Sequence, residues 1–124
     1  MFGRTVQKKE KGNNMKILQT SKDITKVQLY NIQKEASEKM KDAAGEPLKI
    51  KLWALGEREG ESGDTYQVLL IADDNDIVYS TSSATFIGQF LEALEVFGEL
   101  KAIEVQPKKS KRTGREYLAL KVVE

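Results

Sequence analysis

The chain has 124 residues, enough for one domain, and 40% of them are apolar while 31% are charged, as in a soluble protein with a modest core. It contains neither cysteine nor histidine, which excludes disulfides, thiolate nucleophiles, imidazole bases and Cys/His zinc sites. No apolar run approaches the length of a membrane helix and no signal-peptide pattern begins the chain, so we expect a cytoplasmic protein without a membrane partner.

The net charge of +1 hides an uneven distribution along the chain. Residues 1–47 hold ten Lys/Arg against six Asp/Glu, which gives +4, whereas residues 48–124 hold ten against thirteen, which gives −3. Any site for an anion in the second part must therefore come from a local cluster of cations.

The first 47 residues are expected to form a tail and a helical extension. Residues 1–14 are polar, basic and without periodicity, which predicts a disordered tail. Residues 15–18 fit a short extended segment, and residues 21–40 carry apolar side chains at roughly helical spacing, with Ser21 or Asp23 as the expected N-cap. We expect the extension to span residues 15–47.

From residue 48 the apolar period changes to two, which is typical of strands. The stretches "LKIKLWAL" (48–55), "TYQVLLIA" (65–72) and "IVYSTS" (77–82) are separated by short polar turns and predict a meander of strands.

A helix and two further strands are predicted to follow. "SSATFIGQFLEALEVFGE" (82–99) has an apolar stripe of period 3.6, a serine at its start that can cap it, and Gly98 at the C′ position. Residues 100–106 and 115–123 read as strands.

The predicted order over residues 48–124 is β-β-β-α-β-β, which fits a mainly β, five-stranded OB-fold barrel. In that architecture the face of strands 2 and 3 and the loops 1–2 and 4–5 form the ligand site. The loop between strands 4 and 5 is "QPKKSKRTGR" (106–115), with five cations within eight positions. It could bind a polyanion or be a solvated hairpin tip; we favour binding by Lys108, Lys109, Lys111, Arg112 and Arg115.

Aromatic residues are candidate stacking platforms for bases, because ring–base stacking tolerates any sequence. Alternation along residues 48–55 places Lys49, Lys51 and Trp53 on one face, opposite the aliphatic side chains, although Trp53 could instead pack beneath the N-terminal helix. Three tyrosines on predicted strands could also stack or could belong to the core: Tyr66, Tyr79 and Tyr117.

The polar clusters give no sign of catalysis. "DDND" (73–76) lacks the ligand spacing of a calcium loop and is expected as a turn. "STSS" (80–83) has no histidine or suitably spaced lysine to activate a hydroxyl, so helix capping explains it more simply. We expect no enzyme activity, no metal and no cofactor.

Several stretches resemble the small OB-fold single-stranded-DNA-binding proteins of bacteriophages and related mobile elements of Gram-positive hosts. They are "VYSTSSATF" (78–86), "TFIGQFLEALEVFGE" (85–99), "IEVQPKKSKRTGREYLAL" (103–120) and, more weakly, "ITKVQLYNIQK" (24–34). The resemblance implies cooperative, sequence-tolerant coating of replication intermediates in the host cytoplasm, with residues 108–117 as nucleic-acid contacts. It also implies a homo-oligomer or array, and replication proteins as partners.

The sequence therefore predicts non-catalytic binding and protection of single-stranded DNA during replication or recombination. An OB-type RNA-binding module would use the same loop and rings. A protein-interaction or assembly subunit of a replisome or phage particle is a third interpretation, in which the basic loop docks an acidic partner.

Overall fold

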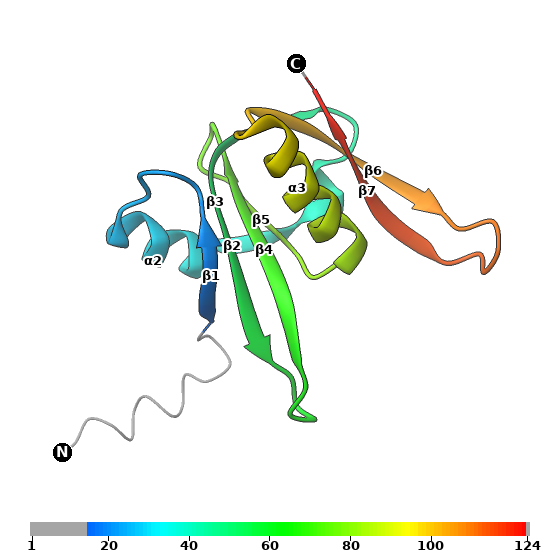
Figure 1. The fold of residues 1–124 in the computed structure, drawn as a ribbon, viewed down its shortest axis with the longest axis horizontal. Coiled ribbons are helices and arrows are strands. Elements are labelled where there is room, and N and C mark those ends of the chain that lie inside the picture. The colour runs from blue at the N-terminus through cyan, green and yellow to red at the C-terminus, as the bar shows by residue number, and fades with distance from the viewer. Residues whose placement is uncertain (1–14, 124) are drawn as a thin grey trace.

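The structure is a computed structural model that describes residues 15–123, so the tail expected over residues 1–14 lies outside the described part. It is mainly β, with one strongly curled half-barrel sheet and two α-helices in the described part (Figure 1). Neither helix of the described residues combines the length and apolar character needed to cross a bilayer.

The elements from residue 47 onward follow the predicted order of strands and helix. The N-terminal part contains β1 (Lys16–Thr20), α2 (Lys26–Lys34), β2 (Ala36–Lys39) and the short 3-10 helix η2 (Met40–Ala43). The remaining elements are β3 (Pro47–Glu59), β4 (Thr65–Asp73), β5 (Val78–Thr81), α3 (Ala84–Phe97), β6 (Ala102–Lys109) and β7 (Glu116–Val122).

The N-terminal segment contributes strands to the sheet as well as a helix. The N-cap of helix α2 is Thr25, not Ser21 or Asp23, because Thr25 and Gln28 form a reciprocal capping box. The helix ends at Lys34, and β2 then pairs in parallel with β5, while β1 pairs antiparallel with β3. The helical periodicity expected up to residue 40 is thus overridden by backbone pairing with a sheet edge.

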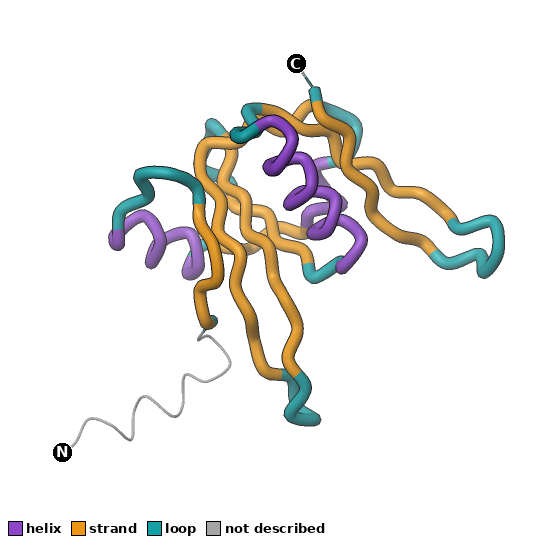
Figure 2. The backbone as a smooth tube through the Cα atoms, in the orientation of Figure 1, coloured by secondary structure: helices purple, strands orange, loops and turns teal. Residues whose placement is uncertain are grey.

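The sheet curls around β3 and remains open. Its strand order is β2-β5-β4-β3-β6-β7, with β1 paired to β3 off this path. The first residues of β3 pair with β6, and the rest of the strand pairs with β4. Among the ladders of residues 15–123 none joins β5 to β7, so the expected closed barrel is a half-barrel here. The β3–β4 and β6–β7 hairpins extend from it as two arms (Figure 2).

Each face of the sheet has its own apolar core. Helix α3 packs Phe86, Ile87 and Phe90 into the larger core, against β3, β4 and β6. Helix α2 covers the smaller core on the other face, where Ile32 meets β4 and β5. As predicted, α3 is capped by a serine, Ser83, and ends at Gly98, whose φ of 78° suits glycine.

A β-bulge at Lys51 turns Trp53 toward the core. Between Ile50 and Leu52, β3 advances by two residues while β4 advances by one, so the alternation of the two faces reverses after Lys51. Trp53 is only 7% exposed and its ring meets Phe90 edge to face, with centroids 5.2 Å apart. The expectation that Trp53 shares an exposed face with Lys49 and Lys51 is therefore wrong.

Replacing Phe90 with alanine should destabilise the protein strongly. Phe90 is fully buried and supports Trp53, so the cavity left by its ring is expected to lower the free energy of unfolding by about 3–5 kcal/mol in a urea titration. Phe97→Ala is the matched control, because Phe97 is 60% exposed at the end of α3 and its loss should cost about 0.5 kcal/mol or less. Equal losses in both variants would contradict this packing.

The fluorescence of Trp53, the single tryptophan, should report a shielded ring. We expect its emission to be blue-shifted relative to the urea-unfolded chain and poorly quenched by acrylamide, because the indole is buried against Phe90. If acrylamide quenches Trp53 as efficiently in the folded as in the unfolded protein, the indole is exposed and this packing is wrong.

Candidate nucleic-acid interface

The turn between β6 and β7 is held by hydroxyls and backbone groups rather than by charge pairs. Ser110 N–H donates to the Arg115 carbonyl at 2.8 Å, and Gly114 N–H donates to the Ser110 carbonyl at 2.8 Å. The Thr113 hydroxyl accepts from Arg115 N–H at 3.2 Å. Gly114 adopts a φ of 74°, which a side chain would disfavour. The turn therefore holds its shape without neutralising its cations.

All five predicted cations of this turn are exposed. Within residues 15–123 the one ion pair is Lys51–Asp76, so none of the five is paired with a carboxylate there. Glu116 stands opposite Lys109 in the β6–β7 register and is the acidic residue of this surface. We call residues 108–117 the basic hairpin, because they include the five cations Lys108, Lys109, Lys111, Arg112 and Arg115.

A shallow hollow borders the basic hairpin. Tyr117 forms one wall, and Thr85 in the first turn of α3 forms another. Tyr117 is 38% exposed and lies directly opposite Lys108 across the β6–β7 ladder. A ring and an ammonium group are thereby presented side by side, as binding of a base and its phosphate requires.

Tyr66 occupies a similar position on the other arm. It is 44% exposed and lies opposite Arg58 across the β3–β4 ladder. Both arms therefore carry an exposed tyrosine beside a cation, and the first turn of α3 lies between the arms (Figure 1). The structure keeps Tyr66 and Tyr117 available as stacking platforms.

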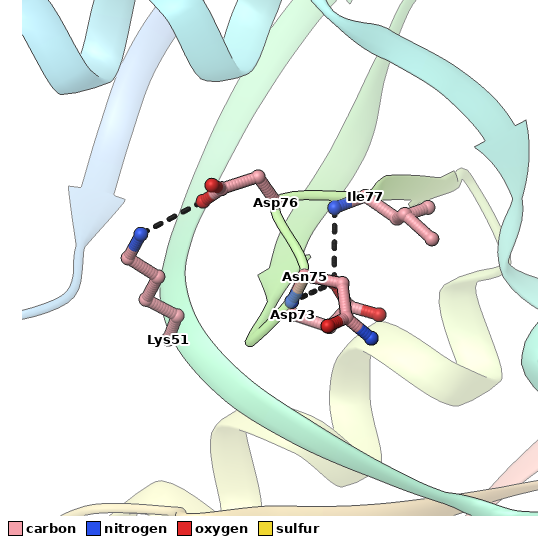
Figure 3. Close-up of polar contacts among 5 residues, drawn as sticks. All are labelled: Lys51, Asp73, Asn75, Asp76 and Ile77. Carbon is pink, nitrogen blue, oxygen red and sulfur yellow. Dashed lines mark hydrogen bonds and ion pairs between the residues drawn. The ribbon is translucent and has the colours of Figure 1, made fainter.

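Lys49 and Lys51 lie away from the basic hairpin. Lys49 pairs with Ala102, and Lys109 lies seven residues further along β6, which amounts to about 23 Å along the strand. Lys51 is 46% exposed and donates to Asp76 at 2.7 Å, and this hydrogen bond and charge pair raise the pKa of Lys51 (Figure 3). Neither lysine joins the basic hairpin, because both lie near the opposite end of the curled sheet.

The "DDND" segment has a structural role. The Asp73 carboxylate accepts the backbone N–H groups of Asn75 and Ile77, both at 2.9 Å, which fixes the turn between β4 and β5 (Figure 3). Asp76 follows with a φ of 65° and holds Lys51. The segment is a turn, as its Asp/Asn content predicts.

Tyr79 lies in surroundings that disfavour a phosphate strand. Its ring is half-buried against the larger core, and its pKa is raised mainly by this burial and further by nearby carboxylates, Asp73 and Glu38 foremost. The negative charge of those carboxylates would repel a polyanion from the neighbourhood of the ring. We therefore withdraw Tyr79, together with Trp53, from the candidate interface.

Sequence reasoning missed a second group of cations. Arg58 at the end of β3, and Lys39 and Lys41 around the start of η2, line a groove that Tyr66 also borders. Arg58 stands alone among glutamates in the sequence, so no cluster marked it. Its place opposite Tyr66 follows only from the register of the β3–β4 hairpin.

Comparisons with known proteins add no family to this description. No family model matches the chain, and neither the curated proteins nor the solved structures contain a significantly similar protein. The candidate interface therefore rests on the residues and geometry of this chain.

Proposed function

We propose that this protein binds single-stranded DNA, without catalysis and largely without regard to sequence, through the basic hairpin. The observation that carries the proposal is five exposed cations within eight positions, without carboxylate partners among residues 15–123, beside the exposed ring of Tyr117. Cations that follow a backbone and rings that stack on bases are the two features that sequence-tolerant binding of single strands needs.

The fold supports the same proposal through its resemblance to an OB barrel. In such a barrel the ligand crosses strands 2 and 3 between the loops 1–2 and 4–5. If β3 corresponds to strand 1 of such a barrel, the β3–β4 and β6–β7 turns correspond to those two loops, and α3 follows the third strand and precedes the fourth. We infer that the protein coats and protects strands during replication or recombination, in the cytoplasm of a phage host or of a cell carrying a mobile element.

Affinity for oligo(dT) should fall steeply with salt and depend on the basic hairpin. With about four phosphates neutralised, the logarithm of the association constant is expected to fall against the logarithm of salt concentration with a slope of about −3, measured by fluorescence anisotropy. The variant Lys109→Gln/Arg112→Gln should make that slope shallower by about 1.4, because two phosphate contacts are lost.

The matched control for that variant is Lys22→Gln/Lys26→Gln. It removes the same charge beside α2, which lies across the molecule from the basic hairpin, and should keep the wild-type slope (Figure 1). Equal effects of both variants would mean that overall charge, not the hairpin, governs binding. An oligo(rU) of equal length belongs in the same titration, since a strong ribose preference would redirect the proposal to RNA.

Tyr117→Leu should weaken oligo(dT) binding by about 1–3 kcal/mol, because an exposed ring that stacks on a base is lost. Tyr117→Phe keeps the ring and should bind like the wild type. Urea unfolding of both variants provides the stability control. If leucine and phenylalanine at this position bind equally well, Tyr117 does not stack on a base.

A further inference from the structure

The groove beside Arg58 has the chemistry of a phosphate site. It lies where β2 and η2 meet the ends of β3 and β5, and its polar lining comprises Lys39, Lys41, Arg58, Tyr66 and the three hydroxyl residues Ser80, Thr81 and Ser82. Every charged residue of this lining is a cation. An anion that enters the groove therefore meets no carboxylate in its wall.

Arg58 supplies an observation of a different kind. Its Nε atom is buried, yet within residues 15–123 it donates to no acceptor, and Arg58 takes part in no ion pair there. Buried guanidinium N–H groups in folded proteins normally have an acceptor. The planar fork of an arginine matches two oxygens of a phosphate, so a phosphate in the groove would satisfy the unpaired donor.

The hydroxyl groups of the groove and the positions of the nearby acids also favour a phosphate in this groove. Thr81 Oγ1 accepts the Ser83 N–H at 3.1 Å, which leaves the hydroxyl proton of Thr81 free to donate. The neighbouring carboxylates Glu38 and Asp42 lie near Tyr79, and residue 79 points to the face of β5 opposite Ser80. In the β2–β5 register Glu38 lies opposite Tyr79 and Lys39 lies opposite Ser80, so this acid and this cation project from different faces of the sheet.

The groove and the hollow at the basic hairpin are lined by residues that are close in the chain. Leu118 lines the groove, and its neighbour Tyr117 lines the hollow. Ser82 lines the groove, and Thr85 three residues later lines the hollow. Adjacent residues of a strand project from opposite faces, so a nucleic-acid strand would reach both sites by passing around β7, the edge strand of the sheet, beside the start of α3.

We propose that this groove seats a phosphate of the same nucleic-acid strand that the basic hairpin binds, with the fork of Arg58 as the principal contact and Lys39 and Lys41 as additional cations. The inference rests on the proposed function. It assigns a binding role to the β2–η2 segment, which lies outside the five-stranded unit.

The variant Arg58→Gln tests this phosphate site. Its binding is measured with two labelled oligo(dT) probes, one of about four nucleotides, which spans one site, and one of about twenty, which spans both. The longer oligomer should bind about tenfold more weakly to the variant, with a salt slope shallower by about 0.7. Arg58→Lys should keep the slope, because the charge stays, but bind more weakly than wild type, because the fork is lost. The short oligomer should lose affinity for the Lys109→Gln/Arg112→Gln variant and not for Arg58→Gln.

The outcomes separate the two proposals. If the wild-type protein binds neither oligomer at low salt, the proposed function fails. If the hairpin variant weakens binding while Arg58→Gln binds the longer oligomer like wild type, only the phosphate seat is overturned. Should Arg58→Gln unfold, Lys39→Gln/Lys41→Gln replaces it, because both lysines are exposed, and an unchanged slope for this variant overturns the seat.

Inorganic phosphate distinguishes a strand phosphate from a free anion. At equal ionic strength, phosphate should weaken binding of the longer oligomer more than chloride does, and Arg58→Gln should reduce this excess, leaving the part that is due to the basic hairpin. If phosphorus NMR detects phosphate bound at Arg58 while the variant leaves oligomer binding unchanged, the groove is a free-anion site and the inference is wrong.

Discussion

The packing of α3 beneath the curled sheet is the interaction on which the rest of the structure depends. Phe86 and Phe90 are fully buried where β3, β4 and β6 meet, and Trp53 meets Phe90 edge to face. The same helix is joined to the β6–β7 hairpin, because Gln89 Oε1 accepts the Leu120 N–H at 2.7 Å. One helix therefore fixes how the β6–β7 arm stands relative to the β3–β4 arm, and with it the spacing between the two tyrosine–cation pairs.

The electrostatics of this protein are local. A net charge of +1 would not suggest a polyanion ligand, yet the basic hairpin concentrates five unpaired cations at one end of the described fold. The acids beside Tyr79 and the "DDND" turn gather elsewhere on the sheet. Since screening limits exposed charges to a range of about 10 Å at ordinary salt, this separation matters more than the total charge.

The N-terminal segment shows how an extension can alter a simple barrel. Where β5 and β7 could have paired, β5 instead pairs with β2, and the sheet stays open. The 3-10 helix that follows buries Met40 in the larger core, and the groove is lined by Lys41 of this helix and by Lys39 at the end of β2. The short β2–η2 segment therefore both keeps the sheet open and supplies the lysines that line the groove.

The elements that rest on local periodicity could be predicted from the sequence. Alternation predicted β3 to β7 in order, and the apolar stripe with its serine cap and Gly98 predicted α3, because these signals depend on neighbours a few residues away. The basic hairpin could also be located from the sequence, because a run of cationic residues in a turn is visible without knowledge of tertiary contacts. These features carry the proposed function.

The surface that each side chain faces depends on pairing between distant segments, which local sequence patterns do not specify. The bulge at Lys51 arises from pairing with β4, and it moved Trp53 from a predicted platform into the core. The parallel pairing of β2 with β5 and the position of Arg58 opposite Tyr66 likewise depend on register between distant segments. A shift of one residue in a ladder reverses every side chain beyond it, and sequence periodicity does not specify where such a shift occurs.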